Sequence, residues 1–468
     1  MQRMYQFVNK RQRIASNVIC LSLLVALVVF TLLVPVAHGD TAPGNLTFSN
    51  TPLLRPEGGS EPAISIANNG TMAITSLRWL EFFTNLWVGP FGSIPTFEGP
   101  IDAALQLRGK RVVLGGGDAD IDLGSTGTMH VSTLIFLVNP AFTAAQLGVS
   151  AITCPNATIG NFDPSTCTSQ IIDRAGADRQ WITSDGSHVY IAYHDAGNST
   201  IIRVQRSDDD GFTWQKVGNP IVGQGRVTGN ATFNNSAGPI VADPFAHNVY
   251  VIYAAGEPGI QKATTATHNN MYVSRSTDMG KTWTASLVFH APLFTALNNI
   301  FPSLAVDPTN GKLYSTWSDA HNIFFSTSSN QGTTWSNAVI VNIPPANTAI
   351  FPWVAAYRGT VDVVYYGTTA GSKDDPTAVW NTYLAQTLNN GADFTQNLVS
   401  NTPNHVGVIC TEGAGCPNPL ETRTLLDLFE VAIDPQNGLA AVVYTDDTLT
   451  TDPSVGRVPQ IVLAQQSP

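Results

Sequence analysis

The sequence predicts an all-β protein, and three observations support that prediction. Only 12% of the 468 residues are charged, and glycine (39) and proline (29) are abundant, which is typical of many short strands joined by turns. A hairpin pattern recurs seven times along the chain, and a turn motif of eight residues recurs three times. Repetition of this kind indicates an array of equivalent structural units.

The first 39 residues are predicted to be a targeting segment and not part of the fold. Four basic residues precede an uncharged apolar run over 18–34, and the small residues Ala37 and Gly39 then stand where a signal peptidase cleaves. We expect a signal peptide over 1–39, with an uncleaved N-terminal membrane anchor helix as the alternative, and a folded domain over 40–468. The protein is therefore expected to be secreted or extracellular, with the membrane reached only through this segment.

Charge excludes one class of partner. The leader carries four basic and no acidic residues, so the remainder has 19 Lys and Arg (23 − 4) against 34 Asp and Glu, a formal charge of −15 (19 − 34). A chain this acidic, without a polybasic run, is not expected to bind nucleic acid. We expect a monomer.

The hairpins follow one pattern: an apolar strand, a turn of Gly, Asn or Asp, and a second strand rich in Val and Tyr. They begin at Glu61, Asp118, Asp178, Ala237, Phe301, Phe351 and Leu426. One hairpin cannot bury both of its faces, whereas four-stranded antiparallel units stacked radially can. The sequence thus predicts a single β-propeller, with a strand near Leu46–Pro52 completing the last blade. Helices should be scarce, with one short helix over 140–147.

The turn motif has the form Ser-x-Asp-x-Gly-x-Thr-Trp and follows the predicted third strand of a blade. Its fixed positions are Ser207, Asp209, Gly211 and Trp214; Ser276, Asp278, Gly280 and Trp283; and Ser328, Asn330, Gly332 and Trp335. The carboxylate can accept local backbone N–H bonds, and glycine permits a positive φ. We therefore interpret the motif as structural.

These three copies resemble the Asp-box, or BNR repeat, of the bacterial exo-α-sialidase-related β-propellers. The resemblance covers roughly residues 45–468 and implies a sialidase-like fold. Seven hairpins favour seven blades, whereas the resemblance favours six, with one hairpin belonging to an insertion.

Strand order fixes which face could carry chemistry. In a blade the innermost strand runs down from the top face and the second strand returns to it, so the repeated turns lie on the bottom face. The sialidase pocket lies on the top face near the axis. The ionisable or polar residues predicted there are Arg55, Glu61, Arg78, Glu81, Asp118, Asp120, Arg174, Asp178, Arg179, His194, Asp195, Glu257, Asp319, His321, Tyr366, Arg423, Asp427, Asp446 and Asp447.

The resemblance implies three roles within this set. Arginines would clamp a substrate carboxylate bidentately, and Arg55, Arg179 and Arg423 are the candidates. Asp118 or Asp120 would be the acid, and Tyr366 with Glu257 the nucleophile. His194 and Asp195 are further substrate-binding candidates.

Each assignment has a structural alternative. Arg179 could pair with Asp178 or a neighbouring carboxylate, Arg423 could be an exposed loop charge, and Tyr366 could pack within its strand. No metal site is assigned. Asp118, Asp120 and Asp122 share one strand face, so Ca²⁺ is a conceivable cofactor, with a backbone-capping acidic turn as the alternative.

Four cysteines lie beyond the leader: Cys154, Cys167, Cys410 and Cys416. The two close pairs predict two disulfides, which suit an oxidising exterior, while a four-cysteine zinc site is the rival interpretation. The first function hypothesis is an extracellular propeller that acts on a glycan, in the manner of an exo-glycosidase. The alternative is a non-catalytic propeller that binds glycan or protein through its top face.

Overall fold

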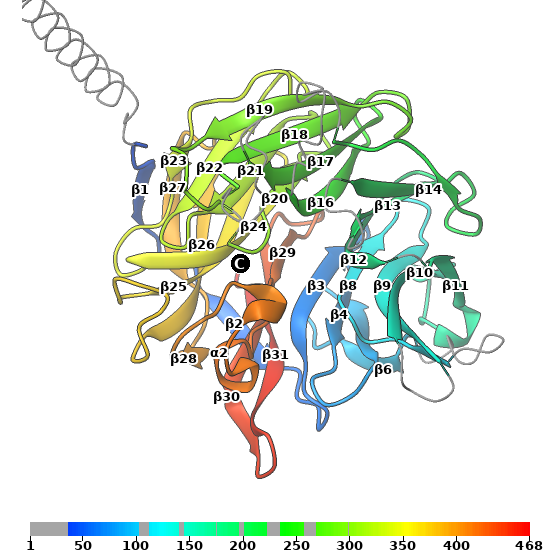
Figure 1. Cartoon of the computed structure of the whole chain (residues 1–468), viewed down its shortest axis with the longest axis horizontal. Helices are drawn as coiled ribbons and strands as arrows, with labels where there is room; N and C mark the ends of the chain where they lie inside the picture. The colour runs from blue at the N-terminus through cyan, green and yellow to red at the C-terminus, as the bar shows by residue number, and fades with distance from the viewer. Residues whose placement is uncertain are drawn as a thin grey trace, which may run out of the picture. The chain divides into compact units, whose positions relative to one another are not determined.

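Seven four-stranded antiparallel blades make up the propeller (Figure 1). The computed structural model describes residues 36–102, 112–139, 145–174, 176–195, 201–221, 235–256, 268–297 and 299–468. Residues 1–35 of the predicted leader, and Glu257, lie outside these ranges. Within them, no helix has the length and hydropathy needed to span a bilayer.

The first three blades follow the chain in order, from the inside outward. Blade 1 is β3 (Ser60–Ile66), β4 (Thr71–Leu77), β5 (Thr84–Pro90) and β6 (Thr96–Pro100). Blade 2 is β8 (Ala119–Leu123), β9 (Met129–Val138), β10 (Ala145–Cys154) and β11 (Thr168–Asp173), with β7 (Val112–Leu114) also paired to β9. Blade 3 is β12 (Ala177–Asp185), β13 (His188–Asp195), β14 (Ile202–Ser207) and β15 (Gln215–Lys216).

The next three blades repeat this order. Blade 4 is β16 (Asn235–Asp243), β17 (Asn248–Ala255), β18 (Asn270–Ser276) and β19 (Thr284–His290). Blade 5 is β20 (Ser303–Val306), β21 (Leu313–Ser318), β22 (Ile323–Ser328) and β23 (Val339–Ile340). Blade 6 is β24 (Thr348–Tyr357), β25 (Thr360–Thr368), β26 (Val379–Thr387) and β27 (Asp393–Leu398), extended by β1 (Asp40–Pro43) and β28 (His405–Val406).

Blade 7 closes the ring with strands from both ends of the folded region. It contains β29 (Glu430–Ile433), β30 (Ala440–Asp452) and β31 (Gly456–Gln466), and its outermost strand is β2 (Phe48–Pro52), antiparallel to β31. The expected N-terminal closing strand and the expectation of seven blades are thus confirmed. The expected helix over 140–147 is wrong for the described residues 145–147, because they begin strand β10.

The core lies between blades. One buried cluster joins Ile64 and Ile74 of blade 1 to Val443 and Leu463 of blade 7. Similar clusters join blades 1 and 2, blades 2 and 3, blades 3 and 4, blades 5 and 6, and blades 6 and 7. Such clusters are expected because one face of each sheet must be covered by the next sheet. Burial of apolar side chains between sheets therefore stabilises the ring at successive junctions.

Side chains also link the innermost strands of neighbouring blades through edge N–H groups. Glu430 accepts from Ile64 N (2.9 Å), and Asp120 accepts from Ile182 N (2.8 Å). Hydroxyls perform the same task for three further edge amides, Leu123 N, Ala242 N and Val354 N. Each innermost strand edge faces the channel, so these bonds satisfy donors that no fifth strand can reach.

The three repeated turns each join the third and fourth strands of a blade, as predicted. Asp209 Oδ1 accepts from Thr213 N (2.7 Å), and Ser207 Oγ accepts from Gly211 N (2.8 Å). The turns at 276–283 and 328–335 make the same two bonds. A fourth, unpredicted copy joins β26 to β27, where Thr387 Oγ1 accepts from Gly391 N (3.0 Å) and Asn389 Oδ1 accepts from Asp393 N (3.2 Å).

Both predicted disulfides are present, between Cys154 and Cys167 and between Cys410 and Cys416. The zinc alternative is wrong, because disulfide sulfurs are not available as thiolate ligands.

Candidate functional site at the channel mouth

The innermost strands lose their regular pairing where they leave the top face. The register between first and second strands breaks at Glu61 in blade 1, Arg179 in blade 3 and Phe351 in blade 6, and each of these residues has a positive φ (49°, 39° and 55°). A non-glycine residue in this region costs about 1–3 kcal/mol. Such bulges redirect side chains, and here they recur at one height of the propeller.

Two of the redirected side chains meet across the axis. Arg179 Nη1 of blade 3 lies 3.9 Å from Glu61 Oε2 of blade 1, although blade 2 separates these blades in the ring. Arg179 is 3% exposed and Glu61 is 1% exposed. Among the described residues, none of the three guanidinium nitrogens has a hydrogen-bond acceptor, so the cation is held by this ion pair and by stacking.

An aromatic plug lies beneath Arg179. The guanidinium carbon lies 3.7 Å from the ring centroid of Trp181, which is fully buried. Trp181 in turn contacts Phe301 (5.4 Å between centroids), ahead of blade 5, and Trp353 (5.2 Å) of blade 6. Because these rings come from different sides of the channel, they fill the axis below the charges.

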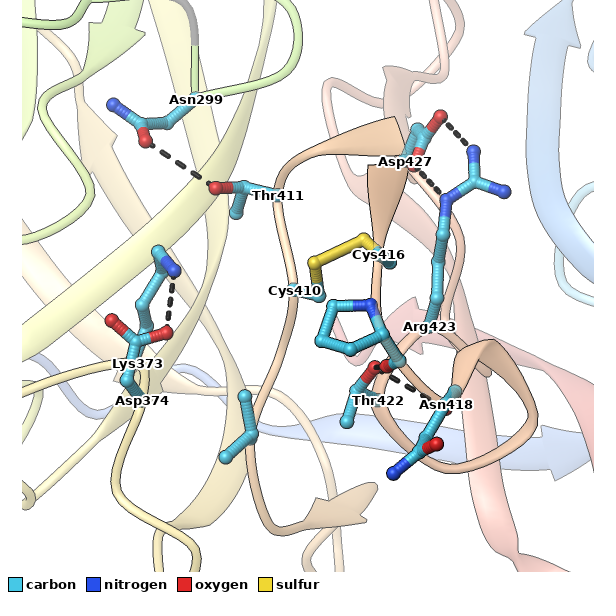
Figure 2. The surroundings of a disulfide bond; sticks show 12 residues. Asn299, Lys373, Asp374, Cys410, Thr411, Cys416, Asn418, Thr422, Arg423 and Asp427 are labelled. Carbon is cyan, nitrogen blue, oxygen red and sulfur yellow. Dashed lines mark hydrogen bonds and ion pairs between the residues drawn. A yellow bond between two sulfur atoms is a disulfide. The ribbon is translucent and has the colours of Figure 1, made fainter. Parts of the chain in front are cut away.

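A second arginine reaches the mouth on the strap, which we define as residues 407–429 between β28 and β29. The strap carries the short helices η3 (Gly413–Gly415) and α2 (Pro419–Thr422) and the Cys410–Cys416 disulfide. Figure 2 shows Arg423 directed onto Asp427, with which it makes two hydrogen bonds (3.1 and 2.5 Å). The Asp427 N–H donates to Glu61 Oε1 (2.9 Å), which connects the strap to the axial pair.

Buried polar contacts hold the strap in place. His405 Nδ1, just before it, lies 2.7 Å from Asp447 Oδ2, and both side chains are buried. The Thr424 hydroxyl donates to the same carboxylate. Despite burial, the contacts with His405, Thr424 and Arg457 lower the pKa of Asp447, so a buried anion anchors the strap.

Six residues therefore form what we call the mouth cluster: Glu61, Asp118, Asp178, Arg179, Arg423 and Asp427. Burial, followed by the charges of Asp118 and Asp427, raises the pKa of Glu61 well above its usual range. Burial also raises the pKa of Asp427, against the opposing effect of Arg423. Burial and mutual repulsion therefore favour the protonated forms of Glu61 and Asp427.

Asp178 is the most exposed member of the cluster. Its side chain is exposed, and one oxygen accepts from Arg179 N (3.0 Å). Loss of hydration within the walled mouth, together with the charge of Asp118, raises the pKa of Asp178 to about 6. A carboxyl group of this kind can donate a proton near neutral pH.

The predicted acids Asp118 and Asp120 occupy different compartments. Asp118 interacts electrostatically with Glu61, Asp178 and Arg423 of the mouth cluster. Asp120 lies below, in a cavity of about 690 Å³ on the bottom side of the channel, which we call the lower cavity. Burial raises the pKa of Asp120 to about 6, although Arg179 and two backbone N–H bonds oppose the shift.

The other predicted site residues lie elsewhere. Tyr366 is fully buried between blades 6 and 7, where it stacks on Phe429 (4.1 Å between centroids) and its hydroxyl accepts from Thr445 N (3.1 Å). Burial raises its pKa far above the ordinary tyrosine value. Tyr366 therefore packs in the core between blades 6 and 7, and it does not belong to the candidate site.

Arg55 belongs to a separate cluster beside blades 1 and 7. It stacks on Phe97 (3.6 Å to the centroid) and pairs with Glu57 (3.0 Å), which also contacts Arg78. Asp195 is buried against Arg203 (2.5 Å). His194 lies near buried His268, where burial and then His194 lower the pKa of His268 to about 4.

Two further predictions can be compared with the geometry. Arg423 is half-buried and paired, which differs from the exposed loop charge considered above. The oxygens of Asp120 and Asp122 bond to backbone N–H groups and to Ser184, and the described residues contain no group of three His, Cys, Asp or Glu side chains arranged to hold a metal. Calcium binding stays an untested prediction.

Comparison with known proteins identifies no family. No family model matches the chain, and no curated protein matches it. Similar solved structures include a Dyadobacter fermentans DSM 18053 protein of unknown function (11% identity, 92% of this chain and 99% of that one, TM-score 0.47). Another is phage phi92 endosialidase, with 9% identity over 90% of this chain and 69% of that one and a TM-score of 0.46. A third is a PL25 ulvan lyase, with 11% identity over 91% of this chain and 94% of that one and a TM-score of 0.48. Similarity this low does not bear on activity.

Proposed function

We propose that this protein is an extracellular, glycan-directed propeller whose mouth cluster hydrolyses glycosidic bonds of neutral or amino sugars. The observation that carries the proposal is the solvent-reaching carboxyl of Asp178, with a pKa of about 6, beside Asp118 and above buried Arg179. Most glycoside hydrolases need a protonated carboxyl to protonate the leaving oxygen and a second carboxylate to activate water or attack the sugar.

In this mechanism Asp178 donates its proton to the glycosidic oxygen while the bond from that oxygen to the anomeric carbon breaks. Asp118 is the second carboxylate, and water supplies the hydroxyl of the new reducing end and the proton that restores Asp178. Asp427, which is partly exposed, would accept a hydrogen bond from a sugar hydroxyl, and buried Glu61 would position it through the Asp427 N–H. Arg179, which lies against both compartments, orients these carboxyls and does not itself react.

The sign of charge at the mouth bears on the substrate. A sialoside, which the resemblance implies, carries a carboxylate and needs unengaged arginines. Here Arg423 is bound bidentately by Asp427, Arg179 is paired with Glu61, and Arg55 lies in another cluster. An anionic sugar would meet four carboxyl groups, so a neutral or amino sugar fits better.

The test uses the full chain and a panel of chromogenic neutral, amino-sugar and sialic acid glycosides. We expect release of the aglycone from a neutral or amino glycoside, and a reduction of about 100-fold or more in turnover for Asp178→Asn. Glycan-array binding by Asp178→Asn should persist. The matched control is Asp319→Asn, because Asp319 is a half-buried carboxylate between β21 and β22, outside the mouth cluster. This variant should retain turnover.

Two outcomes would count against the proposal. Preferential cleavage of the sialoside would refute the charge argument. Glycan binding without any turnover would leave the non-catalytic alternative, in which the same cluster only recognises the sugar.

A further inference from the structure

A cavity lies at the other end of the channel from the mouth cluster. The lower cavity, of about 690 Å³, is lined by the innermost strands of all seven blades and by their turns on the bottom face, such as 67–69 of blade 1 and 184–186 of blade 3. A volume of this size holds a small organic molecule. The aromatic plug lies between this cavity and the mouth, so a ligand here would not occupy the proposed hydrolytic site.

The charged side chains that line the lower cavity are all acidic. They are Asp120, Asp122, Asp185 and Glu430, and among the described residues that line it there is no Lys, Arg or His. The aromatic side chains of Trp353 and Tyr357 and several aliphatic residues form the remaining wall. Arg179, beyond the plug, also acts on Asp120 and Glu430, but the lining itself favours a cation over an anion.

Glu430 adds an observation that is independent of the charge count. It is 3% exposed and lines the cavity, and one carboxyl oxygen accepts from Ile64 N (2.9 Å). The other oxygen, Oε1, has no hydrogen-bond partner among the described residues. Burial, followed by the charge of Asp120, raises the pKa of Glu430 well above its usual range, so an ammonium that pairs with it would displace a proton. A buried polar atom without a partner costs about 1–3 kcal/mol, so a donor at the deep end of the cavity would be stabilising.

The acidic groups are spread along the channel. Asp120 and Asp122 are two residues apart on β8, which separates them by roughly 7 Å along the strand. Asp185 lies beyond, at the turn of blade 3 on the bottom face, where its Oδ2 is 2.6 Å from the exposed His247 Nδ1. A metal ion needs several oxygens converging on one point, and the described residues offer no such group.

We propose that the lower cavity binds a small, elongated organic cation, such as an aliphatic diamine or polyamine. Its terminal ammonium donates to Glu430 Oε1 at the deep end. Its methylene chain lies against the aliphatic and aromatic wall, and a second ammonium lies between Asp122 and Asp185. This site is independent of the proposed hydrolytic function, because its residues lie below the plug.

The experiment is calorimetric titration of the full chain with spermidine and putrescine, alongside 1,4-butanediol as a neutral analogue of putrescine. We expect saturable binding of the amines, no measurable binding of the diol, and fluorescence changes from Trp353. Glu430→Gln keeps an acceptor for Ile64 N but removes the carboxyl group that would pair with the ammonium, and should weaken amine binding about tenfold or more. Asp178→Asn, in the mouth, should leave amine binding within about twofold.

A second variant is Asp185→Asn, at the accessible rim of the cavity, where a substitution is less disruptive to folding. It should weaken spermidine binding severalfold. Equal binding of diol and diamine would overturn the proposal. So would unchanged amine affinity in folded Glu430→Gln and Asp185→Asn. Loss of glycoside hydrolysis in Asp178→Asn with intact amine binding would separate the two proposals.

Discussion

The two ends of the channel are built from the same seven strands, yet they differ in how the backbone presents side chains. In the lower cavity the innermost strands keep regular pairing, and acidic side chains such as Asp120 and Asp122 bond to the next blade. At the mouth the pairing breaks, and Glu61 and Arg179 adopt positive φ and meet across the axis. The regular end offers a lined cavity, whereas the strained end brings together charges from non-adjacent blades.

This difference indicates where binding and chemistry would separate. A cavity with fixed walls and an acidic lining suits recognition of a complementary ligand. A cluster in which Asp178 has a pKa of about 6 suits proton transfer. Strain of this kind persists only when surrounding contacts stabilise it, and at the mouth these include the ion pair of Arg179 with Glu61 and its stacking on Trp181.

The largest expected effect tests whether Arg179 holds the mouth together. Arg179→Met removes a buried cation from among the carboxyls, and we expect the free energy of unfolding to fall by about 3–5 kcal/mol. Chemical denaturation followed by tryptophan fluorescence measures it. Arg179→Lys keeps the charge but loses the planar stacking on Trp181, so an intermediate loss is expected.

A loss below about 1 kcal/mol in Arg179→Met would contradict this account. It would mean that the mouth carboxyls are already neutral and do not depend on the arginine. The contrast between the two ends of the channel would then reflect backbone geometry alone.

Local patterns predicted the architecture because the information for it is local. Each hairpin and each turn is coded within about twenty residues, and the positions of the repeated turns between third and fourth strands followed from strand order. The copy at Thr387 escaped detection because Asn389 replaces Asp and Phe394 replaces Trp, although its hydrogen bonds are retained.

The mouth cluster could be predicted only in part. The sequence placed Arg179, Arg423 and Asp118 on the top face, but their partners depend on contacts between distant blades that no local pattern encodes. A signal for the bulges was present: proline follows Glu61, Gly238, Phe301 and Phe351 at one blade position. Tyr366 was assigned from strand position alone, and that position does not show which face of the blade is packed against its neighbour.

The second prediction concerns stability and pH in the lower cavity. The pKa of Asp120 is raised from 3.8 to about 6, so between these values the folded chain binds more protons than the unfolded chain. The free energy of unfolding therefore falls as pH rises through this window, by roughly 2–3 kcal/mol for this group. Asp120→Asn should lose that part of the slope.

Denaturation midpoints of both chains at pH 4, 5, 6 and 7 measure the difference in slope. Asn cannot accept both backbone N–H bonds, so the variant is expected to be less stable at pH 4, where the native carboxyl is protonated. If stability falls with pH equally in the two chains, Asp120 does not hold a proton in the folded protein. Its carboxylate would then act only as an acceptor for backbone N–H groups.

The smallest effect is expected at the repeated turns, which share the bottom face with the lower cavity but contribute no charge to it. Asp278 Oδ1 accepts from Thr282 N (2.8 Å), and its other oxygen accepts from the Thr282 hydroxyl (2.7 Å). Asp278→Ala should cost about 1 kcal/mol of stability through these exposed bonds. Asp278→Asn is the matched control and should be nearly neutral, because Asn330 makes the equivalent bonds in the third turn. Neither glycoside turnover nor spermidine affinity should change in either variant, because residues 276–283 line neither site. A change in one of them would assign the turns a functional role.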